Sequence, residues 1–313
     1  MTIRVLVLGA TGFLGRRLVG ALATSDWAQP LAASRGAGRA GLPGALALDA
    51  TDADALGTAL QQVDAVINAV AGQPATIAAS AQALRSALDR RGQPALPLVH
   101  FSSMAVYGSA AGTIDESCPF GSDTSPYGQA KVAAEQRLGD YAGCVTLRPG
   151  CIYGGGSPQW STRIAQLLRA HRIGDLGAAG DGCSNLVHVD DVVQATLAAL
   201  RLPAAAGQAY NLAMAQAPSW NEYFIAYARA LRATPVQRIG ARRLALETRL
   251  LAPALKIAEI AGRRIGLRTP PPVPPSLARL WQDSPRLDST RAQRTFALRW
   301  TPLQAALDRE AST

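Results

Sequence analysis

The sequence has few of the side chains that form disulfides or bind metal ions. It contains four cysteines and three histidines in 313 residues. The cysteines form no C-x-x-C pair, and His100, His171 and His188 lie well apart in the chain. Structural zinc sites use such residues at short, regular spacing. The pattern therefore predicts reduced thiols, a cytoplasmic protein and no bound metal.

Aromatic residues are also scarce, at 5% of the chain, and lysine occurs only twice. The net charge of +9 arises from 31 Lys plus Arg against 22 Asp plus Glu, so arginine supplies nearly all the positive charge. These arginines are spread along the chain, whereas proteins that bind nucleic acids combine basic patches with aromatic stacking platforms. We therefore expect no nucleic-acid partner.

Long apolar runs are absent as well. Each apolar stretch is broken by Arg, Asp, Gln or Pro before it reaches the roughly 18 residues that a membrane-spanning helix needs. Residues 1–9 begin directly with a strand pattern and show none of the charged and apolar regions of an export signal. We expect neither a membrane span nor export.

What the chain does contain is an alternation of short apolar runs with stretches of helical period. The apolar runs fall at 3–8, 30–34, 45–48, 64–70, 96–101 and 144–147. The helical stretches fall at 16–22, 53–62, 75–90 and 127–141. This alternation is typical of an α/β fold with a doubly wound parallel sheet. We predict a Rossmann domain over 1–150 plus 187–213, and a smaller, mostly helical substrate lobe over 151–186 plus 214–313.

A glycine-rich turn, residues 9–15, lies between the first strand and the first helix. Glycine lets the backbone turn tightly and approach a pyrophosphate, which binds at the amides and the positive dipole end of the helix. Taken alone, the pattern also fits a turn that only packs a helix against a strand. The residues predicted to bind a dinucleotide here are Gly9, Thr11, Gly12, Phe13, Leu14 and Gly15.

The end of the second strand indicates which dinucleotide is bound. Residues 32–35 are Ala-Ala-Ser-Arg, with no acidic residue. An Asp or Glu would accept from the ribose of NAD, whereas an Arg accommodates the 2′-phosphate of NADP. We predict NADP, held by Ser34 and Arg35 with Arg39 as a helper, and NAD is less favoured. Alternatively Arg35 is a solvated loop arginine. Asp49 could accept from the adenine amino group or cap a helix.

Tyr127 and Lys131 are four residues apart at the start of a predicted helix, so both lie on one face. A lysine acts there as a compact point charge, which a forked guanidinium would not reproduce. Ser103 follows a buried strand and would lie at the carboxyl edge of the sheet, where open α/β folds bind ligands. Each residue alone fits an ordinary surface or turn position, and only their order suggests a shared site.

In this order the motifs resemble the extended short-chain dehydrogenase/reductase family, also called the NAD-dependent epimerase/dehydratase family. The segments at 147–154, 187–191 and 288–292 add to the resemblance. It implies a catalytic set in which Tyr127 exchanges a proton with the substrate, Ser103 holds the same oxygen, and Lys131 binds the nicotinamide ribose. Lys131 and the nicotinamide would both favour the Tyr127 phenolate.

The resemblance implies further contacts beyond the catalytic set. Additional cofactor contacts would come from Ala69, Pro149 and Ile152, together with Lys131. Tyr107 and Cys151 would contact the substrate, although Tyr107 could instead only close the turn after the strand. Pairing of two subunits through 75–90 and 127–141 is implied as well.

Two departures from the family pattern narrow the expected reaction. Dehydratases carry an acidic pair where this chain has Met104 and Ala105, and nucleotide-sugar epimerases place charge-assisted or amide donors for a diphosphate where it has Cys151 and Ser184. We therefore expect an NADP-dependent oxidoreductase acting on the carbonyl or secondary alcohol of a small, fairly apolar substrate. The alternatives are a nucleotide-sugar epimerase with tightly bound NAD(P), and a non-catalytic NADP(H)-binding sensor.

Residues 241–262 have the pattern of a basic amphipathic helix interrupted by a proline. Such a segment can lie on an anionic membrane surface. A substrate-pocket helix with a solvated charged face is the favoured interpretation. The Pro-rich residues 270–275 are expected to be a rigid connector.

Overall fold

The computed structural model describes residues 2–36, 44–92, 94–252, 255, 271–282 and 285–311. In the first half of the chain the elements are β1 (Ile3–Leu8), α1 (Phe13–Ala23), β2 (Ala28–Ser34), β3 (Leu46–Ala47), α2 (Ala53–Leu60), β4 (Ala65–Asn68), α3 (Pro74–Arg91), β5 (Leu98–Phe101), the short helix η2 (Met104–Tyr107), β6 (Thr113–Ile114), α4 (Pro126–Leu138), β7 (Cys144–Pro149) and β8 (Cys151–Tyr153). The second half contains η3 (Pro158–Thr162), α5 (Arg163–Arg169), β9 (Leu186–His188), α6 (Val189–Arg201), β10 (Gln208–Leu212), α7 (Trp220–Ala230), α8 (Ala241–Leu246), η6 (Glu247–Leu251), α10 (Pro275–Gln282), β11 (Arg286–Leu287), α11 (Thr290–Thr295) and α12 (Leu303–Ala311).

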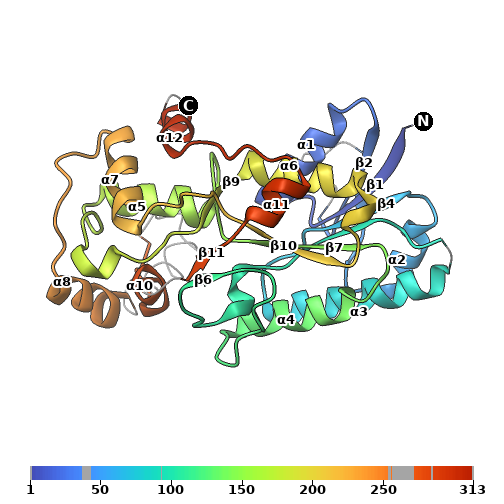
Figure 1. Cartoon of the computed structure of the whole chain (residues 1–313), viewed down its shortest axis with the longest axis horizontal. Coiled ribbons are helices and arrows are strands. Elements are labelled where there is room, and N and C mark those ends of the chain that lie inside the picture. Colours follow the sequence, from blue (N-terminus) through green and yellow to red (C-terminus); the bar gives the residue numbers. More distant parts are fainter. Residues whose placement is uncertain are drawn as a thin grey trace.

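The predicted doubly wound parallel sheet is confirmed. Seven strands lie in the order β10-β7-β5-β4-β1-β2-β3, and all neighbouring pairs are parallel. Helices α2, α3 and α4 cover one face, and α1 and α6 cover the other (Figure 1). Successive residues of a strand point to opposite faces, so Leu6 and Leu8 join the core beneath α2–α4 while Val5 and Val7 join the core beneath α1 and α6.

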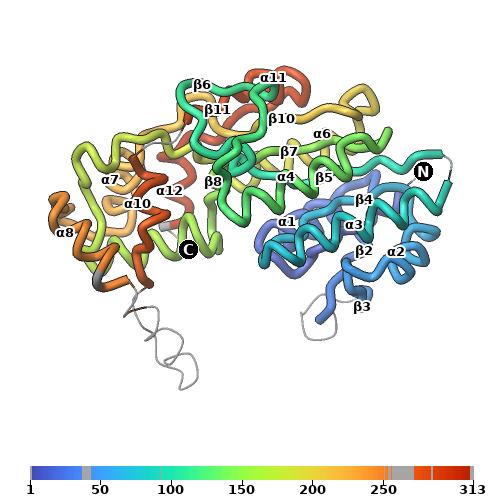
Figure 2. Tube along the Cα trace, turned by 90° about the horizontal axis from the view of Figure 1, so that it is seen from below, coloured from blue at the N-terminus to red at the C-terminus, as the bar shows by residue number. Residues whose placement is uncertain are grey.

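The lobe lies beside the sheet domain (Figure 2). Its core is of a different kind. Its centre is a cluster of aromatic rings, with Trp220 packed against Trp160, Phe224 and Trp281 at centroid distances of 5.3, 5.7 and 6.4 Å. The C-terminal helix α12 packs on α7 and completes this core. Aromatic rings bury a large area per residue, which suits short helices without a regular layer.

The first strand of the predicted Rossmann segment 187–213 does not join the main sheet. Strand β9 instead pairs with β8 in a separate two-stranded sheet. Gly150 makes this possible, because a Cβ there would lie 2.1 Å from the carbonyl oxygen of Asn185. Only β10 returns to the main sheet, beside β7.

The expected division between the two units also differs at the C-terminal end. The sequence places all of 214–313 in the lobe, but Ala292, Phe296 and Leu298 belong to the core of the sheet domain. The ring of Phe296 lies 4.6 Å from that of Tyr210 in β10. Apolar residues in α11 and just after it therefore pack this part of the chain against the sheet domain.

The predicted helix at 241–262 starts at Ala241 as α8 and continues as η6 to Leu251. Residues 256–262, which complete the predicted helix, lie outside the described residues. In the part of the chain that the structure describes, no helix is long and apolar enough to cross a bilayer.

Candidate active site

The glycine turn between β1 and α1 is packed too closely for any larger residue. Gly9 has a φ of +77°, and a Cβ there would lie 2.7 Å from the carbonyl oxygen of Ala69. A Cβ on Gly15 would lie 2.2 Å from the carbonyl oxygen of Gly9. Such approaches are sterically forbidden. Helix α1 can therefore pack closely against the end of β1 only because residues 9 and 15 are both glycine.

Gly12 precedes α1 and leaves the start of the helix open to a ligand. It provides no side-chain cap, and the first amides of a helix have no partner within the helix itself. Those amides, at Phe13 and Leu14, lie at the positive end of the helix dipole, which favours an anion. The turn therefore has the close backbone approach and the donors that the pyrophosphate of a dinucleotide requires.

The carboxyl end of β2 carries a hydroxyl and a guanidinium group and no carboxylate. Ser34 Oγ lies 3.2 Å from Thr11 Oγ1, so the strand end is tied to the glycine turn. Arg35 follows and is exposed. Asp49 accepts the backbone N–H and the hydroxyl of Thr51, and these bonds, with a smaller contribution from Arg35, lower the pKa of Asp49. One oxygen of Asp49 is thus engaged in a local turn.

The other predicted cofactor contacts lie at the same edge of the sheet. Ala69 follows β4, and its N–H donates to the end of β1. Pro149 ends β7, and Ile152 lies in β8 just beyond it. Arg39, the predicted helper for a 2′-phosphate, lies outside the described residues.

Helix α4 begins where its sequence favours a helix start and where it can touch η2. Ser125 Oγ accepts from the N–H of Gly128 at 3.2 Å, and Pro126 takes the first helical position. A Cβ on Gly128 would lie 2.6 Å from a backbone carbonyl oxygen of η2. This glycine lets α4 pack directly on the turn that follows Ser103, which brings Tyr127 beside Ser103.

The three predicted catalytic side chains meet at this contact. Ser103 Oγ accepts a backbone N–H of η2 at 3.2 Å, and its hydroxyl lowers the pKa of the neighbouring Tyr127. Tyr127 exposes 37% of its surface, so a substrate can reach it, whereas Lys131 exposes only 2%. Lys131 Nζ lies 5.9 Å from the centre of the Tyr127 ring and donates to the carbonyl oxygens of Phe101 at 2.7 Å and Val70 at 3.4 Å.

Burial dominates the electrostatics of these groups. It raises the pKa of Tyr127, and the hydrogen bond with Ser103 offsets part of this rise. Burial lowers the pKa of Lys131 to about 8, against the raising effect of Glu135. The combined effect of Lys131 and a nicotinamide on the Tyr127 phenolate stays a prediction from the sequence. At neutral pH Tyr127 is a neutral phenol beside a mostly protonated Lys131.

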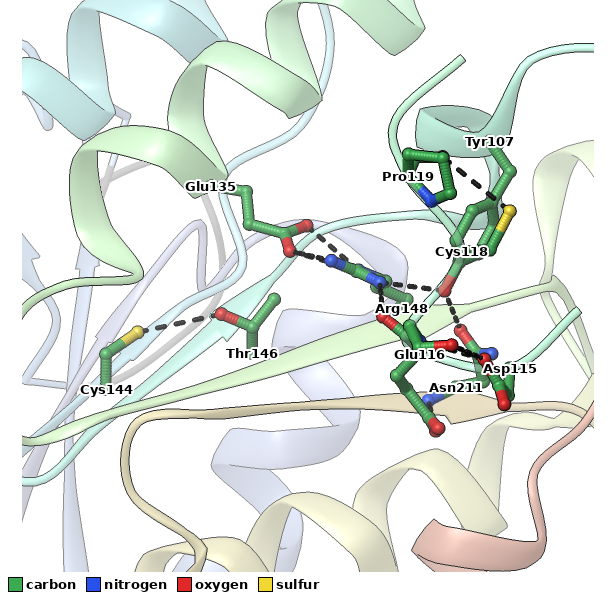
Figure 3. Close-up of polar contacts among 11 residues, drawn as sticks. Tyr107, Asp115, Glu116, Cys118, Pro119, Glu135, Cys144, Thr146, Arg148 and Asn211 are labelled. Atoms are coloured by element: carbon green, nitrogen blue, oxygen red, sulfur yellow. Dashed lines mark hydrogen bonds and ion pairs between the residues drawn. The ribbon is translucent and has the colours of Figure 1, made fainter.

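Two predicted substrate contacts are not supported by their positions. Tyr107 is fully buried, and its hydroxyl donates to Asn211 Oδ1 at 2.7 Å and accepts from Arg148 Nη1 at 2.8 Å (Figure 3). Cys151 is 3% exposed in the lobe core, and burial raises the pKa of its thiol. Both side chains are committed to the interior, so neither can contact a substrate.

The residues in place of the diphosphate donors are engaged elsewhere. Ser184 is 1% exposed, and its hydroxyl donates to the carbonyl oxygen of Pro218 at 2.7 Å. A neighbouring cavity of about 490 Å³ includes Cys183 in its lining. The charged residues lining it are Asp181, Glu222 and Arg286.

Sequence reasoning missed the buried ion pair of Glu135 and Arg148. Glu135 is the next residue after Lys131 on the same face of α4, at a spacing of four. Arg148 Nε lies 3.0 Å from Glu135 Oε1, and both side chains are 7% exposed. The four-residue spacing from Lys131 was the signal that the sequence offered for Glu135. Its partner Arg148 lies in strand β7, so the local sequence could not reveal the pair.

Among the described residues, no group of three or more His, Cys, Asp or Glu side chains could hold a metal ion.

A parallel sheet with a glycine turn and a Ser-Tyr-Lys cluster at its carboxyl edge defines a dinucleotide-binding enzyme fold. The sequence model of the NAD dependent epimerase/dehydratase family matches residues 5–213. The chain belongs to this family of NAD(P)-dependent enzymes.

Several solved structures share the fold. UDP-N-acetylglucosamine 4-epimerase from Bacillus cereus is 17% identical, with 99% of each chain covered and a TM-score of 0.71. RMD from Pseudomonas aeruginosa, complexed with NADPH, is 22% identical, with 99% of this chain and 98% of that chain covered and a TM-score of 0.70. The human epimerase family protein SDR39U1 (isoform 2), with NADPH, is 19% identical, with 99% of each chain covered and a TM-score of 0.70. No curated protein matches the sequence.

Proposed function

We propose that the protein is an NADP-dependent oxidoreductase that interconverts a carbonyl and a secondary alcohol on a small, fairly apolar substrate. The observation that carries this proposal is the meeting of Ser103, Tyr127 and Lys131 at the edge of the sheet that also holds the glycine turn. Fold alone does not assign a reaction, so the side chains must carry it.

The glycine turn would hold the pyrophosphate, and Ser34 and Arg35 would hold the 2′-phosphate of NADP. An exposed arginine with no carboxylate at the end of β2 favours the phosphorylated cofactor. Bound NADPH would supply a hydride to the carbonyl carbon. Lys131, fixed by two backbone carbonyls, would add positive charge beside the reacting oxygen.

In the reductive direction Tyr127 acts as the acid. Its neutral phenol donates its proton to the carbonyl oxygen as the new C–H bond forms, and Ser103 hydrogen-bonds the same oxygen. The raised pKa of Tyr127 suits a group that must carry a proton at neutral pH. General acid catalysis of this kind contributes about 10²–10⁴-fold.

The surroundings favour redox chemistry over the other reactions of the family. Met104 and Ala105 follow Ser103, so no carboxylate is present there to assist loss of water. The cavity next to Ser184 has two carboxylates and one arginine in its lining. A diphosphate would meet repulsion there instead of the charge-assisted donors that it normally uses.

The cofactor assignment is tested by Arg35→Ala in calorimetric titrations. Loss of a charge-assisted hydrogen bond is worth about 1.5–3 kcal/mol, so we expect the Kd for NADPH to rise at least about tenfold while NADH binding is unchanged. Arg4→Ala, at the opposite edge of the sheet, serves as the control. An unchanged NADPH affinity, or a strong preference of the wild type for NADH, would refute the assignment.

The reaction is tested by following NADPH oxidation with a panel of ketones and aldehydes. Tyr127→Phe should lower kcat about 10²–10⁴-fold without weakening NADPH binding, whereas Tyr141→Phe, remote from the site, should not. Turnover that survives in Tyr127→Phe would sink the catalytic role. Binding without turnover of any carbonyl would favour a sensor, and interconversion of nucleotide sugars would favour an epimerase.

A homodimer through α3 and α4 and a cytoplasmic location stay predictions from the sequence. All four cysteines are free, which is compatible with a reducing compartment. Light scattering of the purified protein, with a charge placed on an exposed position of α3, would test the dimer.

A further inference from the structure

A buried ion pair, Glu135 with Arg148, lies next to Lys131 on helix α4. Glu135 follows Lys131 by one helical turn on α4, and both residues are buried. Arg148, from β7, presents its Nε to both Glu135 oxygens at 3.0 and 3.2 Å, and its Nη2 contacts the nearer one. The carboxylate is therefore paired with Arg148 and lies one helical turn from Lys131, whose pKa it raises.

Arg148 is held too firmly to move away from Glu135. Its Nη1 donates to the Tyr107 hydroxyl at 2.8 Å and to the carbonyl oxygen of Glu116 at 3.2 Å (Figure 3). The guanidinium also lies 5.2 Å and 5.4 Å from the ring centres of Tyr107 and Phe120. Tyr107 belongs to η2, the turn that begins at Ser103. The network thus joins the Ser103 turn, helix α4 and strand β7.

We propose that Glu135 is a positioning residue for catalysis, which keeps Lys131 protonated and in place, and that Arg148 limits how much of the Glu135 charge reaches Lys131. The proposal rests on the proposed function, because the charge of Lys131 matters only if Lys131 takes part in the reaction. It adds an electrostatic role to residues outside the Ser-Tyr-Lys set.

The groups that face Lys131 come from each element packed around it. On α4 these are Tyr127 and Glu135, and β5 and the segment just after β4 contribute backbone carbonyls. Strand β5 also contributes His100, whose pKa burial and Lys131 lower to about 3. His100 is therefore neutral in the working range. Glu135 is the only carboxylate among these side chains.

The test measures the protonation of Lys131 directly and needs neither cofactor nor substrate. The chain has only two lysines, Lys131 and Lys256, so protein labelled with ¹³C at the lysine ε-carbon gives two signals, which Lys256→Arg assigns. In Glu135→Gln the Lys131 pKa should fall by about 1, because an attracting charge is lost and Arg148 is left unbalanced. In Arg148→Met it should rise, because Glu135 then acts on Lys131 alone.

The direction of the Glu135→Gln shift separates this role from a merely structural one. A loosened site would hydrate Lys131 and raise its pKa toward the ordinary value. A rise, or no change, in Glu135→Gln therefore overturns the proposal. The matched control is Glu247→Gln, which breaks the equally buried ion pair of Glu247 with Arg172 in the lobe and should leave the Lys131 pKa unchanged.

If Glu135→Gln does not fold, the decision passes to Arg148→Met and the double variant Glu135→Gln/Arg148→Met. The single variant should raise the Lys131 pKa, and the double variant should return it to near the wild-type value. A double variant that stays as high as the single overturns the proposal. With an active substrate, the limb of the kcat–pH profile that reports Lys131 should shift in parallel, and a shift of pKa without any turnover would fault the proposed function instead.

Discussion

Among the described residues are two buried Arg–Glu pairs with nearly the same local chemistry, one in each unit. Arg148 and Glu135 in the sheet domain are each 7% exposed, and Arg172 and Glu247 in the lobe are 11% and 8% exposed. In both pairs the arginine also donates to a backbone carbonyl. They differ in their neighbours. Glu135 lies one helical turn after Lys131, whereas Glu247 begins η6 in the lobe, with no residue of the Ser-Tyr-Lys set beside it.

The comparison shows that burial of an ion pair does not by itself identify a functional site. Removing two charges from water is costly, and their attraction repays that cost only when the remaining hydrogen bonds are satisfied. Both pairs meet this condition. Glu135 has a proposed role because it follows Lys131 by four residues on α4. Its nearness to Lys131, and not its pairing with Arg148, is the reason for that role.

The largest expected effect is on stability, and it should be similar for both pairs. Glu135→Gln and Glu247→Gln each leave a guanidinium buried without its counter-ion, which costs about 3–5 kcal/mol of unfolding free energy. Urea unfolding at pH 7 measures it. Only Glu135→Gln should also move the Lys131 pKa. If Glu247→Gln also moves the Lys131 pKa, the two ion pairs are coupled through the fold, and Glu135 has no special effect on Lys131.

A second prediction concerns Lys131 itself, whose burial is costly. Lowering its pKa from 10.5 to about 8 corresponds to about 3 kcal/mol. Part of this is offset by the hydrogen bond to the Phe101 carbonyl. Lys131→Met should therefore unfold with a free energy about 2 kcal/mol higher than the wild type at pH 7, while losing activity.

The sign of its pH dependence follows from the depressed pKa. Between about pH 8 and 10.5 the native state has released the Lys131 proton while the unfolded state still holds it, so wild-type stability rises with pH across that window. The advantage of Lys131→Met should shrink over the same range. An advantage that stays constant with pH would show that packing, and not charge, causes it. Lys131→Arg, which stays charged, should be less stable than the wild type at every pH in this range.

Sequence reasoning succeeded where a pattern is local. The strands of the main sheet follow from short apolar runs between helical stretches, and the spacing of Tyr127 and Lys131 fixes their shared face. It failed for β9, which pairs with β8 because Gly150 lets the backbone approach Asn185. Strands of three residues carry too little periodicity to reveal their partners.

Contacts between distant segments account for the other differences. Tyr107 looked like a pocket residue because it follows Ser103 closely, yet its hydroxyl is taken by Arg148 and by Asn211, 104 residues away in sequence. Burial, which one sequence does not show, raises the pKa of Tyr127. The surroundings of Tyr107 and Tyr127 therefore depend on tertiary packing, which the order of the motifs does not reveal.

The smallest effects compare a tyrosine hydroxyl of each unit. Tyr107→Phe removes a hydroxyl that serves both Asn211 and Arg148, and it should cost about 1–2 kcal/mol of unfolding free energy. The Tyr153 hydroxyl in the lobe is buried and has no hydrogen-bond partner among the described residues. Tyr153→Phe should therefore change stability by less than about 0.5 kcal/mol, or increase it, since the cost of desolvating that hydroxyl disappears. Urea unfolding of both variants side by side measures the difference, and a loss in Tyr153→Phe as large as that in Tyr107→Phe would mean that the lobe hydroxyl is satisfied after all.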